Sequence, residues 1–234
     1  MNGLGAAFVE AWKLLSGFDA DLVGIVALSL QVSLTAVLLA TAIGLPLGAL
    51  IAVERFRGRQ ALIVLLNALM GLPPVVVGLL VYLLLSRAGP LGSLGILFTP
   101  TAMVIAQTIL IAPIIAALAR QTLEDAWREY EEQLRSLGAA RHTAAITLIW
   151  DTRFSLVTIV LAGFGRAAAE VGAVMIVGGN IDGVTRVMTT SIALETSKGD
   201  LPLALGLGIV LIALIVVLNA GASLVRDAAV RRYG

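Results

Sequence analysis

Residues 22–53 read LVGIVALSLQVSLTAVLLATAIGLPLGALIAV, and none of them is charged. A helix of about 20 apolar residues crosses the hydrocarbon core of a bilayer, so this stretch is long enough to span one. The whole chain has the same character: 59% of its residues are hydrophobic and 13% are charged. Soluble domains carry about a quarter charged residues. The sequence therefore predicts a membrane protein with several spans and no room for a separate catalytic domain.

Four more apolar stretches bring the expected spans to five, in an all-α membrane fold. They cover residues 60–86, 101–119, 154–177 and 203–225. In the second of these, Pro73 and Pro74 remove two backbone donors, so we expect this span to be kinked or broken.

The N-terminal segment has apolar residues at helical spacing, namely Leu4, Phe8, Trp12 and Leu15. This spacing favours a short amphipathic helix over residues 4–16 that lies at the membrane surface, with a flexible tail as the alternative. We therefore expect an N-terminal interfacial helix within residues 1–20 and a single transmembrane domain over residues 21–234. A polar loop at residues 120–153 interrupts that domain.

Basic residues are distributed unequally between the two sides of the membrane. Eleven fall on one side if there are five spans: Arg55, Arg57, Arg59, Arg120, Arg128, Arg135, Arg141, Arg153, Arg226, Arg231 and Arg232. Four fall on the other side: Lys13, Arg87, Arg186 and Lys198. Because loops rich in Lys and Arg stay in the cytoplasm, we expect an external N-terminus and a cytoplasmic C-terminus.

The polar loop begins with a helical pattern that has one apolar face. Its apolar residues are spaced by three and four: Leu123, Trp127, Tyr130, Leu134 and Leu137. Gly138 suits the end of this helix, because glycine tolerates the left-handed conformation there. A second short helix is expected over residues 140–150. The pattern alone favours an ordinary solvated loop helix.

The spacing in this loop resembles the EAA loop of ABC importer permeases. That pattern is glutamate-alanine-alanine, three residues, glycine, nine residues, an aliphatic residue, one residue and leucine-proline. The matching positions here are Glu132, Gln133, Leu134, Gly138, Leu148 and Trp150. The glutamate and the glycine agree, whereas Gln133 and Leu134 replace the two alanines, and Trp150 and Asp151 replace the closing leucine-proline. These departures leave the details of docking open.

Two further stretches are similar to permeases of the molybdate and sulfate group. They are LPPVVVGLLVYLLLSRAGPLG at residues 72–92 and FGRAAAEVGAVMIVGGNIDGVTRVMTTSIALETSKGD at residues 164–200. The stretch at residues 164–200 most resembles the tungstate branch. The resemblance implies a type I ABC importer permease, which is the inner-membrane subunit of an ATP-driven oxyanion importer. Tungstate is the expected ion, with molybdate or sulfate as alternatives.

The resemblance also implies partners and a coupling site. The expected assembly is a homodimer with two nucleotide-binding ATPase subunits and an external substrate-binding protein, without nucleic acid. Glu131, Glu132, Arg135 and Gly138 would lie at the ATPase contact. The chain has no Walker A loop, so we expect it to hold no cofactor itself, with ATP and Mg²⁺ bound by the ATPase partner.

Two charges lie one helical turn apart inside the expected fourth span, namely Arg166 and Glu170. Charges at bilayer depth are costly and mark either a pathway or a paired contact. Three interpretations remain open: a structural salt bridge, a translocation path or gate that includes Gly172, or a contact at a dimer seam. Small residues around the pair predict close helix packing: Gly163, Gly165, Ala169, Gly172 and Ala173.

A polar segment follows this span, and four of its residues are candidates for an outer gate or receptor contact: Asn180, Arg186, Thr189 and Thr190. Asp182, Glu195 and Asp200 are interspersed, so this is not a clean anion site. Gln107 and Asn219, inside spans, are expected to make hydrogen bonds between helices.

Two other classes of protein are disfavoured. An intramembrane enzyme needs a catalytic cluster at one depth, whereas His142, the only histidine, lies in the polar loop far from Glu170. The chain also has no cysteine, so a thiolate metal site is excluded and no metal is expected. A proton-driven secondary transporter, with Glu170 as carrier, would be expected to show an internal repeat, and no convincing repeat is present.

Overall fold

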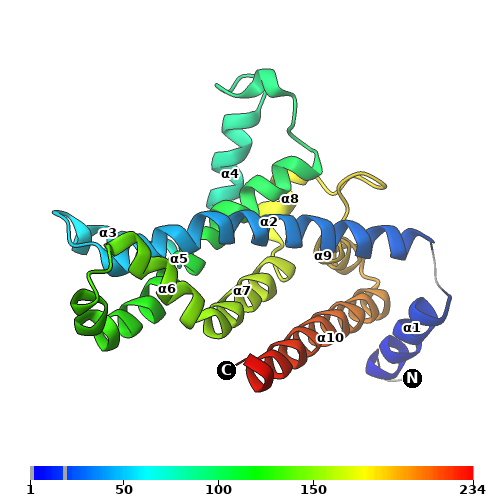
Figure 1. Cartoon of the computed structure of the whole chain (residues 1–234). Coiled ribbons are helices and arrows are strands. Elements are labelled where there is room, and N and C mark those ends of the chain that lie inside the picture. The colour runs from blue at the N-terminus through cyan, green and yellow to red at the C-terminus, as the bar shows by residue number, and fades with distance from the viewer. Residues whose placement is uncertain (1–2, 18–19, 234) are drawn as a thin grey trace. The chain divides into compact units, whose positions relative to one another are not determined.

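The computed structural model describes residues 3–17 and 20–233, and within them every regular element is helical. The elements are α1 (Gly3–Gly17), α2 (Ala20–Val53), α3 (Arg59–Leu69), α4 (Pro74–Leu85), the short 3₁₀ helix η1 (Gly92–Leu94), α5 (Pro100–Ser136), α6 (Arg141–Asp151), α7 (Arg153–Ala168), α8 (Gly172–Gly178), α9 (Met188–Lys198) and α10 (Leu201–Tyr233). Figure 1 shows their order along the chain. The predicted all-α fold is confirmed.

Three of the described helices are long and apolar enough to cross a membrane, namely α2, α5 and α10. Two bent pairs bring the number to five if each pair is one span. In these pairs α3 meets α4 at 100° and α6 meets α7 at 73°. The break between α3 and α4 falls at Pro73-Pro74, as predicted, and Pro74 begins α4 where its missing N–H costs nothing.

The prediction of one continuous fourth span over residues 154–177 is wrong. Helix α7 ends at Ala168 and α8 begins at Gly172, so three residues interrupt the helix. The interruption is stabilised by side chains that bind backbone groups at the break, which the apolar pattern does not reveal.

The expected boundary between the third span and the loop helix is also absent. Helix α5 runs without a break from Pro100 to Ser136, through Pro113 and into the polar loop. Its polar half, residues 120–136, contains no glycine or proline and is rich in Glu, Arg, Leu and Gln. These residues are strong helix formers, so the change from apolar to polar does not end the helix.

The chain forms two compact units, and the long helices contribute to both. Unit 1 comprises residues 1–36, 73–107 and 165–221. Unit 2 comprises residues 37–72, 108–164 and 222–234.

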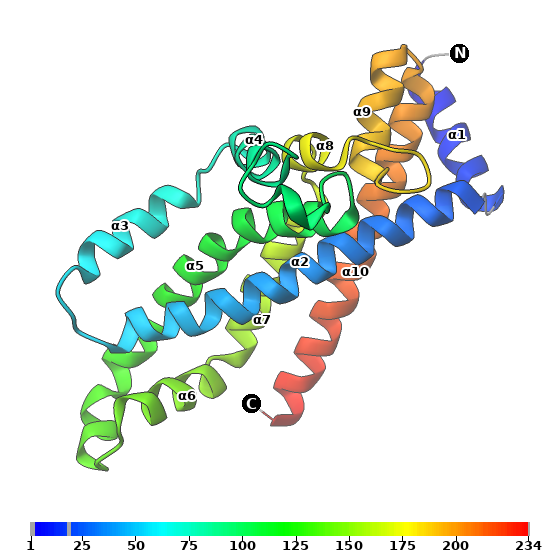
Figure 2. The ribbon, with the colours of Figure 1, turned by 90° about the horizontal axis from the view of Figure 1, so that it is seen from above.

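In unit 1, α4 and α8 lie side by side (Figures 1 and 2). A Cβ atom on Gly78 would lie 2.8 Å from the Cα atom of Ala173, so only glycine allows this approach. Helix α1 buries Ala7 and Ala11 and exposes Phe8 and Trp12. The predicted N-terminal helix is therefore present, whereas its place at a membrane surface stays a prediction. The side chains of Leu4 and Leu15 lie outside the described part.

In unit 2, α2 packs closely against α5. A Cβ atom on Gly48 would lie 2.8 Å from the carbonyl oxygen of Ala116 and 2.9 Å from the backbone nitrogen of Arg120. Helix α6 folds back from the end of α5 (Figure 2) and contributes Ala144 and Leu148 to a buried cluster with Ala49, Ala52, Val53, Leu123, Ala126 and Trp127. This cluster joins α2, α5 and α6.

Candidate functional site

The break between α7 and α8 is built around Glu170, whose side chain is 4% exposed. Its Oε2 accepts a hydrogen bond from an Arg166 guanidinium nitrogen at 2.6 Å, and its Oε1 accepts one from the backbone N–H of Ala173 at 3.1 Å. The hydroxyl of Thr189 donates to the carbonyl oxygen of Glu170 at 2.8 Å. Glu170 therefore stabilises the first turn of α8 and ties α7 and α9 to the break.

Of the three interpretations of the Arg166–Glu170 pair, the salt bridge is present in the structure. The carboxylate is fully engaged inside unit 1, whereas the side chain of Arg166 is 37% exposed. An anion that reached this point would therefore meet Arg166 and not Glu170. The roles in a path, a gate or a dimer seam stay predictions.

The small residues around the pair pack unequally. A Cβ atom on Gly172 would lie 3.0 Å from a methyl group of Val75, and one on Gly163 would lie 3.2 Å from the side chain of Ile115. A Cβ atom on Gly165 would have no such neighbour within 4 Å. The expected close packing thus holds at Gly163 and Gly172, and Gly165 lies on an open side of the helix.

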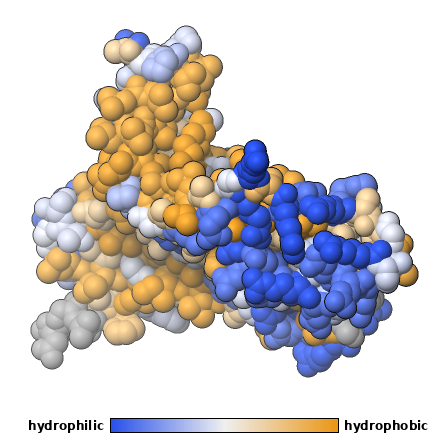
Figure 3. Space-filling model, turned by 90° about the vertical axis from the view of Figure 1, so that its left-hand side faces the viewer, coloured by the Kyte–Doolittle hydropathy of each residue, from blue (hydrophilic) through white to orange (hydrophobic). Residues whose placement is uncertain are grey.

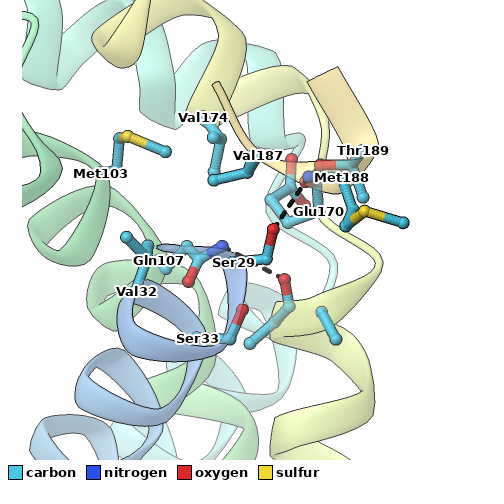
Figure 4. Close-up of a pocket in the computed structure, with 12 residues that line it drawn as sticks. Ser29, Val32, Ser33, Met103, Gln107, Glu170, Val174, Val187, Met188 and Thr189 are labelled. Atoms are coloured by element: carbon cyan, nitrogen blue, oxygen red, sulfur yellow. Dashed lines mark hydrogen bonds between the residues drawn. The ribbon is translucent and has the colours of Figure 1, made fainter. Parts of the chain in front are cut away.

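A small cavity of about 10 Å³ lies beside Glu170 (Figure 4). Its polar lining includes Ser29, Ser33, Gln107 and Thr189. Gln107 donates to the carbonyl oxygen of Ala167 at 3.1 Å, which is the expected bond between helices, and its Oε1 has no hydrogen-bond partner among the described residues. Asn219, in contrast, bonds within its own helix. A cavity of this size is that of about one water molecule, so it does not admit a tetrahedral oxyanion.

The sequence pattern did not single out Ser29, which lines this cavity and binds the first residue of α9. The hydroxyl of Ser29 accepts a hydrogen bond from the backbone N–H of Met188 at 2.8 Å (Figure 4) and donates to the carbonyl oxygen of Ile25 at 2.6 Å. A serine inside an apolar helix was the available signal, but its partner is far away in the sequence.

The residues expected at an outer gate or receptor contact have different environments. Thr189 and Thr190 are buried, and the Thr190 hydroxyl accepts a hydrogen bond from the Val187 backbone N–H at 3.0 Å at the start of α9. Asn180 has a positive φ of 51° at the end of α8. Arg186 pairs with Asp182 at 2.8 Å beside a hollow of about 390 Å³. Of these features, the Arg186–Asp182 pair lines the hollow, whereas Thr189 and Thr190 are buried.

Thr185, which no sequence pattern singled out, organises the turn after α8. Its hydroxyl donates to the carbonyl oxygen of Gly178 at 2.6 Å and accepts from the backbone N–H of Ile181 at 2.9 Å. It is fully buried, so its role is to hold the turn.

In the polar loop, α5 ends as the sequence predicts. Gly138 has a φ of +69°, and its N–H donates to the carbonyl oxygen of Arg135 at 3.0 Å. The N–H of Ala139 donates to the carbonyl oxygen of Leu134 at 3.0 Å. These two bonds form a Schellman motif, in which the positive φ favours glycine.

The predicted apolar face of this helix is buried at its first four positions, fully at Leu123 and Trp127 and partly at Tyr130 and Leu134. Leu137 is 81% exposed, because the helix has already ended at Ser136, so its place on that face was wrong.

The four expected coupling residues all lie around the end of α5. Glu131 pairs with Arg135 at 2.6 Å, whereas Glu132 is exposed and has no ion pair among the described residues. Helix α6 exposes Ile146 and Trp150. Hydrophilic residues gather over this end of unit 2 (Figure 3). The α5–α6 turn therefore offers charged groups and exposed apolar side chains together, which is the composition of a protein contact.

Comparisons with known proteins agree with these features. Residues 44–234 match the family model of the binding-protein-dependent transport system inner membrane component. The tungstate uptake system permease protein TupB of Peptoclostridium acidaminophilum is 42% identical, over 94% of this chain and 96% of the relative. A probable anion ABC transporter permease protein of Haloferax volcanii is 38% identical, over 91% of this chain and 94% of the relative.

A second tungstate uptake system permease protein TupB, from Campylobacter jejuni, is 38% identical over 70% of this chain and 69% of the relative. The resemblance seen in the loop and in the apolar segments is thereby confirmed, and the enzyme and secondary-transporter alternatives lose their basis. The chain belongs to the family of binding-protein-dependent transport system inner membrane components, as the multi-pass permease subunit of an ABC transporter.

Proposed function

We propose that this permease carries tungstate. The observation that supports this choice most directly is the 42% identity, over 94% of the chain, with a tungstate uptake permease. Sulfate and molybdenum permeases are 32% and 29% identical over 81% and 83% of the chain. The three oxyanions share their shape and charge. The higher sequence identity to the tungstate permease is therefore what favours tungstate over molybdate or sulfate.

The family implies an ATPase partner and a substrate-binding protein. We infer in addition a homodimer with two ATPase subunits, which bind ATP and Mg²⁺ in place of this chain. The chain has at most five candidate spans among its described residues. Because few helices make a thin wall around a pore, a path between two copies is the simplest arrangement. The distribution of basic residues supports an external N-terminus and a cytoplasmic C-terminus.

In this proposal the α5–α6 turn receives motion from the ATPase. Helix α5 is one element from Pro100 to Ser136, so a displacement at its polar end acts directly on its apolar part. Helices α6 and α7 are separated by Thr152 alone, and α7 leads to the break at Glu170. Both routes from the turn are therefore short and helical.

At the break, we assign different tasks to the two charges. Glu170 holds α8 in place, and the partly exposed guanidinium of Arg166 attracts a dianion to the path. Guanidinium groups bind tetrahedral oxyanions by paired N–H donors, which supports this assignment. The cavity beside Glu170 is too small for the ion, which agrees with a path between two copies and not through this cavity.

The test is uptake and ATPase activity of the assembled transporter in liposomes, with its binding protein loaded with tungstate, molybdate or sulfate in turn. We expect tungstate to support uptake at the lowest concentration. Uptake of sulfate or molybdate without uptake of tungstate would overturn the choice of ion, and uptake without ATP would overturn the ATP-driven mechanism.

A further inference from the structure

Five arginines surround two glutamates in unit 2, where three apolar helical segments end. The arginines are Arg55, Arg59, Arg120, Arg128 and Arg135, and the glutamates are Glu124 and Glu131. No charge occurs in residues 22–53, 60–86 or 100–119, and the cluster follows or precedes each of these stretches directly. Arg55, Arg59 and Arg120 lie at the ends of these apolar stretches and therefore at the level of the lipid headgroups, whereas Arg128 and Arg135 lie further along α5.

A hollow of about 320 Å³ opens at this cluster, and only three of the arginines line it: Arg55, Arg59 and Arg128. The two glutamates also line it, but each is paired with an arginine that does not. Glu124 is paired with Arg120, and Glu131 with Arg135 at 2.6 Å. Glu124 also pairs with Arg59 and Arg128, and Glu131 also pairs with Arg55, so five arginines share two carboxylates and the cluster has an excess of positive charge.

These three arginines differ in how firmly they are held. The Nε of Arg59 donates to the carbonyl oxygen of Ile51 at 2.8 Å, and the group lies 3.3 Å from Glu124. The side chains of Arg55 and Arg128 are 74% and 71% exposed. The hollow thus has one anchored guanidinium and two largely exposed ones, of which Arg128 donates to Glu124 at 3.0 Å and Arg55 lies 3.8 Å from Glu131.

The carboxylates do not remove this positive charge. Burial raises the pKa of Glu124, but Arg59, Arg128 and Arg120 outweigh burial and hold the pKa below its usual range. Glu124 is therefore ionised at neutral pH, and the count of five positive against two negative charges already includes it.

Two apolar residues, Ala52 and Trp127, line the hollow beside its charged residues. Trp127 contributes to its wall and is itself buried in the cluster that joins α2, α5 and α6. Helix α3 begins at Arg59 and exposes Val64 and Leu65 further along. The arginines would contact the anionic head of a lipid, and the exposed apolar residues of α3 would contact its hydrocarbon chains. A free anion would use only the arginines.

We propose that this hollow binds the phosphate headgroup of an anionic phospholipid. Arginine forms paired hydrogen bonds to phosphate, and basic pockets between membrane helices bind such headgroups. The acyl chains would lie along the exposed apolar side of α3. The proposal goes beyond the transported ion and does not depend on it, because the hollow shares no residue with the break at Glu170.

The test is native mass spectrometry of the assembled transporter with phosphatidylglycerol or phosphatidylcholine added in equal amounts. We expect phosphatidylglycerol to be retained preferentially. The variant Arg55→Gln/Arg128→Gln should lose about tenfold or more of that binding, since each basic residue contributes strongly to anionic lipid binding. Arg226→Gln/Arg231→Gln removes the same charge from α10, also in unit 2, and should change the binding by less than about twofold.

Three results would overturn the proposal. Equal retention of the two lipids would show that the charge of the headgroup does not determine binding. Displacement of phosphatidylglycerol by millimolar inorganic phosphate or tungstate would show a site for a free oxyanion. Loss of the ATPase subunit from the Arg55→Gln/Arg128→Gln variant, with lipid binding unchanged, would assign the hollow to that subunit. Arg55→Lys/Arg128→Lys keeps the charge and should retain part of the binding, so a folding defect is distinguishable.

Discussion

At the scale of single residues, Glu170 shows how a charge is accommodated inside an apolar chain. Each carboxylate oxygen has a donor, one from Arg166 and one from the backbone of Ala173. A buried ion pair is stabilising only when such hydrogen bonds are complete, and removal of one partner leaves an uncompensated charge. The pair therefore has to be tested by comparing single with double substitutions.

We expect Arg166→Ala to destabilise the protein more than the double variant Arg166→Ala/Glu170→Gln. The single change leaves the Glu170 carboxylate buried without a cation, at a cost of about 1–3 kcal/mol. The glutamine of the double variant is neutral and still accepts the Ala173 N–H. The measurement is the thermal unfolding midpoint of the purified permease in detergent.

Arg186→Ala is the matched control for this comparison, because it breaks another pair at the same spacing whose Asp182 partner is 79% exposed. It should shift the midpoint little. If the shifts of the unfolding midpoint caused by Arg166→Ala and by Glu170→Gln simply add in the double variant, the two side chains do not stabilise each other. If the double variant is stable and also transports at the normal rate, neither charge belongs to the path.

Sequence reasoning reached the Arg166–Glu170 pair but not its function in the fold. The spacing of four residues predicts the ion pair, because it is a local property. The cap on α8 and the bond from Thr189 depend on a segment that returns nineteen residues later, with no signal in the apolar pattern. For the same reason Ser29 and Thr185 were missed, since their importance depends on partners that only the fold brings near.

At the scale of elements, the end of α5 is a place where sequence and structure agree closely. Gly138 is at the expected helix end with a positive φ, and its surroundings are open, so an added Cβ atom would meet nothing within 4 Å. Any effect of a substitution there arises from the backbone conformation alone. A substitution at Gly138 therefore changes the shape of the turn without changing its packing.

We expect Gly138→Ala combined with Glu132→Ala to reduce the ATPase activity stimulated by the binding protein about fivefold or more, which is the range of typical coupling energies. The reason is that the turn relaxes and an exposed carboxylate at the proposed contact is lost. The measurement is ATPase activity of the reconstituted transporter with and without loaded binding protein.

Gly95→Ala provides the control, since Gly95 also has a positive φ and open surroundings. It carries the same backbone strain away from the polar loop and should leave stimulation intact. Normal coupled uptake by the Gly138→Ala/Glu132→Ala variant would contradict the assignment of this turn to the ATPase contact.

The packing of α2 on α5 allows another test at this scale. Gly48→Ala places a methyl group against the α5 backbone at 2.8 Å, so the helices must separate, at about 1–3 kcal/mol. Gly24→Ala lies on the same helix with nothing within 4 Å, and it should be neutral or stabilising because alanine favours helices. The thermal midpoint of the Gly48→Ala variant should therefore fall, whereas that of the Gly24→Ala variant should stay or rise. Equal shifts would mean that the close approach at Gly48 has no energetic importance.

The elements were predictable where a single physical signal determines them. Apolar runs placed α2, α4, α5 and α10, and the two prolines placed the bend between α3 and α4. The break at residues 169–171 was not predictable, because the hydrogen bonds that stabilise it involve Thr189, which only the fold brings near. The long extension of α5 is not visible in the apolar pattern, because a change from apolar to polar residues marks the end of a span but not the end of a helix.

At the scale of the whole molecule, the orientation in the membrane is the prediction with the widest consequences. It determines which end meets the binding protein and which meets the ATPase. It rests on the unequal division of basic residues, eleven against four, which is a strong asymmetry for short loops. The chain has no cysteine, so single cysteines can report the exposure of chosen sites without any background substitution.

We expect Leu137→Cys and Val184→Cys to be labelled from opposite sides of the membrane. Both positions are exposed, Leu137 at the end of α5 and Val184 in the turn after α8. A membrane-impermeant maleimide should label Val184→Cys in intact spheroplasts and Leu137→Cys only in inverted vesicles, with the parent chain unlabelled in both. Labelling of both positions from one side would contradict a membrane crossing between them, and the reverse pattern would invert the orientation. The reverse pattern would also place the proposed ATPase contact on the wrong face of the membrane, because the partner that hydrolyses cytoplasmic ATP reaches only the cytoplasmic side.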